Sequence, residues 1–108
     1  MPGSLEYLDA SGRSPFAYWF NGLNAEAAAK VNTAITRLAC GNLSNVKPVG
    51  SGVSERTIDF GPGYRIYFGQ DGGDIIILLA GGTKRRQQDD IRTAISRWND
   101  YKQRRRRL

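Results

Sequence analysis

A chain of 108 residues can bury the core of one domain, and its single cysteine excludes an internal disulfide. The absence of histidine excludes imidazole acid–base pairs, histidine-ligated metals and histidine-containing triads. The net charge of +6 is uneven, because residues 1–83 carry six basic and seven acidic side chains, whereas residues 84–108 carry ten and three. Such an asymmetry is typical of a protein that binds a polyanion such as RNA, DNA or an acidic protein surface. Without a signal peptide or an apolar run of about 18 residues, we expect a soluble, cytoplasmic protein with no membrane segment.

The N-terminal part of the chain predicts a short strand and a first helix. Residues 4–9 alternate imperfectly between apolar and polar side chains, as in a short strand. Ser14 and Pro15 form a favourable helix start. A short amphipathic helix follows from large apolar residues at helical spacing: Phe16, Trp19, Phe20 and Leu23.

A second helix is predicted from about Asn24 to Cys40, with Gly41 as its stop. Its apolar stripe consists of Ala28, Val31, Ile35 and Leu38. We expect Cys40 to fill part of the core, because free cysteines are usually buried.

The next segment predicts a loop and then a strand. Residues 41–52 contain glycines and a proline without periodicity, which indicates a loop whose one cation is Lys47. From Val53 to Phe60 the chain alternates, which places Arg56 on one face of a strand and Glu55 on the other.

Two central strands are predicted next. Residues 64–68 alternate and place Arg65 and Tyr67 on one face, opposite an apolar face. Residues 75–80 form an apolar run typical of a strand covered on both faces, and residues 71–74 suit a tight hairpin between the two strands. At residues 81–84 the chain turns from apolar to cationic beside two glycines, where we expect a sheet of this kind to hold a phosphate.

A final helix is predicted to begin between Lys84 and Gln88, with Asp89 and Asp90 in its first turn. We divide the chain into one domain, 1–103, and a basic C-terminal tail, 104–108. The predicted class is α+β, with two N-terminal helices and a C-terminal helix packed on a small, mainly antiparallel sheet.

Acidic residues and glycines match no metal or nucleotide signature. The pairs Asp71/Asp74 and Asp89/Asp90 suit a turn and a helix start better than a Mg²⁺ site. Residues 81–84 lack the spacing of a Walker A loop. We therefore expect no metal, no small-molecule cofactor and no nucleotide hydrolysis.

Cationic side chains are the remaining candidates for chemistry. They are Lys47, Arg56, Arg65, Lys84, Arg85 and Arg86. Preorganised cations and backbone N–H groups stabilise a phosphodiester transition state, and in RNA the 2′-hydroxyl can be the nucleophile. Lys84 or Lys47 could act as base or acid, since a strongly positive site favours a neutral amine. Tyr67, beside Arg65, could stack on a base.

Structural roles stay open for the same residues. Arg65 could instead form a cross-strand ion pair with Glu55 or Asp59, Tyr67 could simply pack, and Lys47 could be a solvated loop residue. The run at 104–107 could be a solubilising tail or could add nonspecific RNA affinity.

The segments KPVGSGV, GPGYRIYF and LLAGGTK, with QQDDI after the last, resemble the RelE/ParE toxin superfamily, and more closely its HigB-like branch of addiction-module killer proteins. The resemblance covers nearly the whole chain and implies the fold described above. It implies a toxin of a type II toxin–antitoxin module, an endoribonuclease that enters the ribosomal A site and cleaves mRNA. It also implies a cognate antitoxin, often a helix-turn-helix DNA-binding protein.

From the resemblance and the chemistry together we assign catalytic roles to Arg65, Lys84 and Arg85. Substrate-binding roles fall to Lys47, Arg56, Tyr67 and Arg86.

Two departures from the family pattern concern the chemistry. The branch usually has Glu-Leu-Arg-Ile where this chain has residues 55–58, Glu-Arg-Thr-Ile, which moves the arginine to the opposite strand face. The tyrosine that serves RelE corresponds to Ile91, so the general acid and base are unassigned. Two alternatives therefore stay open: a ParE-like inhibitor of DNA gyrase, or an inactive homologue within a DNA-binding regulatory complex.

Overall fold

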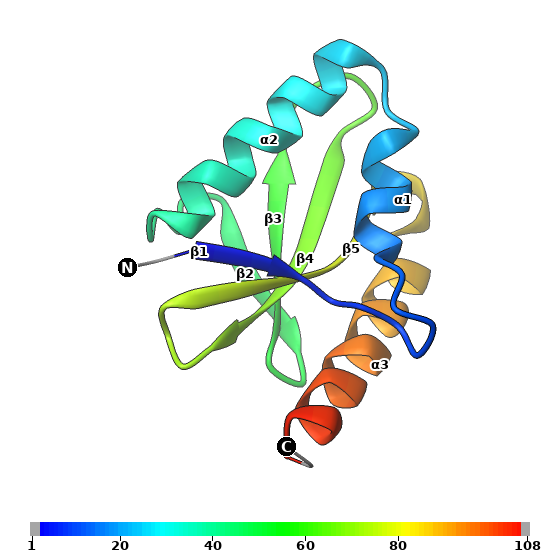
Figure 1. Ribbon diagram of the computed structural model, residues 1–108. Coiled ribbons are helices and arrows are strands. Elements are labelled where there is room, and N and C mark those ends of the chain that lie inside the picture. The colour runs from blue at the N-terminus through cyan, green and yellow to red at the C-terminus, as the bar shows by residue number, and fades with distance from the viewer. Residues whose placement is uncertain (1–2, 107–108) are drawn as a thin grey trace.

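Five strands form a single mixed sheet in the computed structural model, which describes residues 3–106 (Figure 1). The strands are β1 (Gly3–Glu6), β2 (Val46–Gly50), β3 (Val53–Ile58), β4 (Tyr64–Asp71) and β5 (Ile75–Thr83), in the spatial order β1-β5-β4-β3-β2. β1 pairs with β5 in parallel, and the other neighbours are antiparallel. The α+β class and the mainly antiparallel sheet are therefore confirmed.

Helices cover both faces of this sheet. α1 (Pro15–Asn21) and α2 (Ala25–Ala39) lie on one face, and α3 (Gln87–Arg106) follows a 3₁₀ turn, η1 (Lys84–Arg86), onto the other (Figure 1). Ile66 and Phe68 of β4 pack in the core under α1 and α2, whereas Tyr67 packs in the core under α3 with Trp98. The predicted alternation of residues 64–68 is thus confirmed.

The helix starts follow the predicted caps. Ser14 Oγ accepts a hydrogen bond from the Ala17 N–H at 3.0 Å, and Asn24 Oδ1 accepts from the Ala27 N–H at 2.9 Å. The prediction for Cys40 is wrong, because its side chain is exposed. Cys40 lies at the C-cap of α2, where its backbone N–H donates to the Thr36 carbonyl at 3.1 Å.

The prediction of a loop over residues 41–52 is also wrong, because this segment contains β2 at the edge of the sheet. β2 is short, contains Pro48 and shifts register between Pro48 and Gly50, all of which suit an edge strand. Its side chains are exposed or only partly buried, so the apolar alternation that would reveal a strand is absent. Lys47 consequently lies in the sheet, directly opposite Glu55.

A bulge in β5 sets the orientation of the two glycines at its end. Tyr67 pairs with Ala80 and Phe68 with Leu78, which leaves Leu79 as an extra residue. A Cβ at Gly81 would lie 2.1 Å from Trp19 Cε3, and a Cβ at Gly82 would lie 2.0 Å from Asp90 Oδ2. Glycine is therefore required for α1 and α3 to approach β5. The expectation that these glycines hold a phosphate is wrong for Gly82, since the Asp90 carboxylate lies against it.

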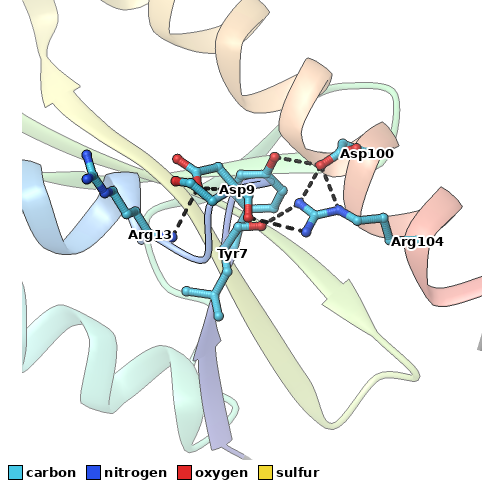
Figure 2. Close-up of polar contacts among 7 residues, drawn as sticks. Tyr7, Asp9, Arg13, Asp100 and Arg104 are labelled. Carbon is cyan, nitrogen blue, oxygen red and sulfur yellow. Dashed lines mark hydrogen bonds and ion pairs between the residues drawn. The ribbon is translucent and has the colours of Figure 1, made fainter.

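The C-terminal end of α3 is tied to the N-terminal segment (Figure 2). The Tyr7 hydroxyl donates to Asp100 Oδ2 at 2.7 Å, and Arg104 Nε donates to the same oxygen at 2.9 Å. The Arg104 guanidinium also donates to the Leu8 carbonyl and lies 5.2 Å from the centre of the Tyr7 ring. Residues 104–106 of the predicted tail thus belong to α3, and Arg107 and Leu108 lie outside the described residues.

Candidate functional site

A carboxylate with no exposed surface, Glu55, lies at the centre of a polar cluster on the face of the sheet that α3 covers. Arg65 Nε lies 3.4 Å from Glu55 Oε2, and Lys47 Nζ lies 3.8 Å from Glu55 Oε1. Gln87, the first residue of α3, donates a hydrogen bond from Nε2 to Glu55 Oε2 at 2.9 Å. We call Lys47, Glu55, Arg65, Tyr67 and Gln87 the Glu55 cluster. The cross-strand ion pair of Arg65 with Glu55, an alternative that the sequence left open, is therefore present.

Strand register explains why these residues meet. Lys47, Glu55 and Tyr67 occupy directly paired positions on β2, β3 and β4. Arg65 is two residues from Tyr67 on the same strand, so its side chain leaves the same face.

Several buried polar atoms of the Glu55 cluster lack hydrogen bonds. Within residues 3–106, Glu55 Oε1, Arg65 Nε and the Tyr67 hydroxyl have no hydrogen-bond partner. Burial, and next the Glu55 carboxylate, raise the pKa of Tyr67 far above its ordinary value, so the phenol stays protonated. Glu55 Oε1 and Arg65 Nε make ion-pair contacts but no hydrogen bond. Buried polar atoms with unused hydrogen-bonding capacity are rare and often mark a functional site. The cluster is therefore the first candidate site.

Exposed cations lie at the same end of the sheet as Arg65. Arg65 pairs with Gly82 of β5, and η1 begins two residues later with Lys84. Lys84, Arg85 and Arg86 are all exposed. These side chains give this end of the sheet a cationic surface, and Arg65, whose side chain is 14% exposed, leaves β4 at the same end.

Near this surface the carboxylate of Asp90 limits the positive charge. Burial raises the pKa of Asp90, and Arg86 opposes that shift. The end of the sheet that carries η1 is thus cationic on its exposed side and acidic where α3 meets Gly82.

The remaining predicted site residues have different outcomes. Lys47 is 62% exposed and pairs with Glu55, which separates it from Arg65. Tyr67 is fully buried, so the packing alternative is confirmed and the stacking prediction is wrong. Arg56 follows Glu55 in β3 and lies on the other face of the sheet, against α2, and therefore does not join the cluster.

Glu55 and Gln87 are the members of the site that the sequence analysis did not assign a site role. Glu55 shares a strand face with buried Val53, and an acidic residue in that register was the available signal. Nothing in the sequence indicated a site role for Gln87, because its hydrogen bond to Glu55 depends on how α3 crosses the sheet.

Within residues 3–106 there is neither a metal-ligand cluster nor a membrane-spanning helix. Cysteine and carboxylate side chains form no group of three or more that could hold a metal ion. None of the helices in this range is both long and apolar enough to cross a bilayer.

Comparison with known proteins finds a relative in Haemophilus influenzae. No family model matches the chain. Over 80 residues, the chain is 44% identical to an uncharacterized protein of Haemophilus influenzae, and the match covers 73% of this chain and 81% of that protein.

Proposed function

The chain belongs to one family with this Haemophilus influenzae protein, and we propose that it is the toxin of a type II toxin–antitoxin module, a ribosome-dependent mRNA endoribonuclease with a RelE/ParE-like fold. The observation that carries the proposal is the placement of Arg65. Its side chain is held by buried Glu55 and lies at the end of the sheet where Lys84 and Arg85 are exposed.

The proposed reaction is an attack of an RNA 2′-hydroxyl on the adjacent phosphorus. The 2′-oxygen–phosphorus bond forms, the bond to the 5′-oxygen breaks, and one proton passes from the 2′-hydroxyl to the leaving 5′-oxygen through a base and an acid. The products are a cyclic phosphate and a 5′-hydroxyl. Arg65, Lys84 and Arg85 stabilise the added negative charge on the phosphorane oxygens.

Glu55 has a positioning role in this proposal. It is fully buried and lies between Lys47 and Arg65, so it fixes the direction of the Arg65 guanidinium without contacting RNA. Lys47 and Arg86, both exposed, contribute contacts to flanking phosphates.

Dependence on the ribosome follows from the same site. Because Tyr67 is buried, it cannot grip a base, and the alignment of the reacting 2′-hydroxyl comes from the ribosomal A site. The proposal therefore places the protein in the cytoplasm, with an antitoxin as its partner.

The test is primer extension on a defined mRNA in a reconstituted translation reaction, with and without ribosomes. We expect cuts within the A-site codon only when ribosomes are present. Arg65→Ala should slow cleavage by about 100-fold or more, as loss of a transition-state donor does. Arg65→Lys should recover part of the rate by restoring the charge.

Two further variants separate chemistry from folding. The double substitution Lys84→Ala with Arg85→Ala changes exposed residues and should slow cleavage without moving the unfolding midpoint. Arg92→Ala, on the exposed side of α3, is the matched control and should cleave normally. Absence of cuts with ribosomes present would remove the ribonuclease from consideration. A folded Arg65→Ala variant that cleaves at the wild-type rate would instead remove Arg65 from the mechanism.

A second candidate, a ParE-like inhibitor of DNA gyrase, is favoured by a specific observation. The charge of Arg65 is already compensated by Glu55, as expected for a residue with a structural role. Induction in cells discriminates the two functions, since a ribonuclease stops translation first, whereas a gyrase inhibitor elicits DNA damage and filamentation.

A further inference from the structure

A second cationic site lies on the opposite face of β3, where a cavity of about 330 Å³ opens between α2 and the strand. Its charged lining consists of Lys30, Arg37, Arg56 and the carboxylate of Asp59. Thr33, Asn45 and Thr57 add polar side chains. We call this space the α2 cavity.

Arg56 is a charged residue of the α2 cavity that is buried without a full set of hydrogen-bond partners. Only 6% of the residue is exposed, and its Nε has no hydrogen-bond partner within residues 3–106. One terminal nitrogen donates to the Thr57 carbonyl. Burial, and next the nearby charge of Arg37, lower the pKa of Arg56.

The cations of the α2 cavity outnumber its one carboxylate, Asp59. In the part of the chain that the structure describes, Lys30, Arg37 and Arg56 take part in no ion pair. Lys30 instead lies 5.5 Å from the centre of the Phe60 ring. A buried guanidinium without an anion is costly, and a ligand that supplies the anion would remove that cost.

We propose that the α2 cavity binds a phosphate group through Arg56, Arg37 and Lys30. Three cations and one carboxylate leave a net charge of +2 in the cavity, which complements a phosphate dianion better than a singly charged carboxylate. Two guanidinium groups can each donate paired hydrogen bonds to phosphate oxygens. Asn45, which also lines the cavity, carries a side-chain amide that can donate to the same oxygens.

The site is independent of the proposed cleavage. Glu55 and Arg56 are adjacent in β3, so their side chains leave opposite faces of the sheet. Phosphate binding at Arg56 thus stands whether or not Arg65 acts on RNA.

The test is a calorimetric titration of inorganic phosphate into the full-length protein at constant ionic strength. Arg56→Met and Arg37→Gln should each weaken binding by about 10-fold or more, since hydrogen bonds to charged groups are the strong ones. Arg92→Gln removes one positive charge from exposed α3 and should stay within about 2-fold of wild type. Arg37 is exposed, so the Arg37→Gln variant keeps the test valid should Arg56→Met fail to fold.

Competition experiments identify the source of the phosphate. A short RNA with a 5′-phosphate is compared with the same RNA carrying a 5′-hydroxyl, and a gain in affinity that requires Arg56 assigns the site to a nucleotide phosphate. If inorganic phosphate binds and the 5′-phosphate gives the RNA no gain in affinity, the site is assigned to the free anion. Absence of phosphate binding, wild-type affinity for phosphate in both Arg56→Met and Arg37→Gln, or equally effective competition by acetate would overturn the proposal.

Discussion

Glu55 and Arg56 are neighbours in β3 and are both almost completely buried. The charge of Glu55 is compensated by side chains of opposite charge, whereas the charge of Arg56 is not. On the α3 face, Glu55 has Arg65, Lys47 and Gln87 within contact distance. On the α2 face, Arg56 has a backbone carbonyl and the like charge of Arg37. On the α3 face, side chains of the protein neutralise the buried charge. On the α2 face, a bound anion would be needed to neutralise it. The first arrangement can hold Arg65 in place, and the second can bind a ligand.

The largest expected change in stability comes from a substitution on the α3 face, at Glu55. Glu55→Gln removes the charge that compensates Arg65 and should lower the free energy of unfolding by about 3 kcal/mol, as the loss of one partner from a buried pair does. Urea unfolding at neutral pH measures the change. Lys47→Ala removes an exposed partner of the same carboxylate and should cost below about 1 kcal/mol. Equal losses in the two variants would show that burial of Glu55 does not decide the effect.

On the α2 face, we expect a substitution of the buried charge to stabilise the protein. Arg56→Met replaces a buried, uncompensated charge with an apolar side chain of similar length and should raise the free energy of unfolding by about 1 kcal/mol. The same urea experiment, without phosphate in the buffer, measures it. A loss of more than about 2 kcal/mol would mean that Arg56 already has an adequate partner within the fold.

A smaller effect is expected in the pH dependence of stability, through Tyr67 on the α3 face. The pKa of Tyr67 is raised in the folded protein, so its contribution to stability is complete below the unfolded value of 10.0 and is lost as the pH rises above it. Tyr67→Phe should therefore lose less stability than wild type between about pH 8 and about pH 11. Tyr18→Phe, at a residue that is 78% exposed, is the control. Identical pH dependence in wild type and Tyr67→Phe would contradict the placement of Tyr67 beside Glu55.

The sequence predicted those features that depend on local pattern. Alternation over residues 64–68 gave the correct faces for Ile66 and Tyr67, and Ser14 and Asn24 marked two helix starts. These features depend on neighbours within a few residues, which the chain displays directly.

Features that depend on distant packing were missed. β2 carries exposed side chains and a proline, so nothing local distinguished it from a loop. Cys40 is exposed because it caps α2, which ends at Ala39. For Tyr67 the sequence left packing and base stacking open, and the way α3 crosses the sheet decides for packing. The role of Glu55 arises from partners on three other elements, β2, β4 and α3, and so could not be read from β3 alone.

The central claim, that the two faces of β3 differ in charge compensation, is tested most directly by NMR of the arginine Nε–H groups during a phosphate titration. We predict that phosphate shifts the Arg56 and Arg37 resonances at lower concentrations than it shifts the Arg65 resonance, because Glu55 already neutralises Arg65. The assignments come from Arg56→Met, Arg37→Gln and Arg65→Lys. A shift of the Arg65 resonance with Arg56 unmoved, or no shift in any of the three, would contradict the account.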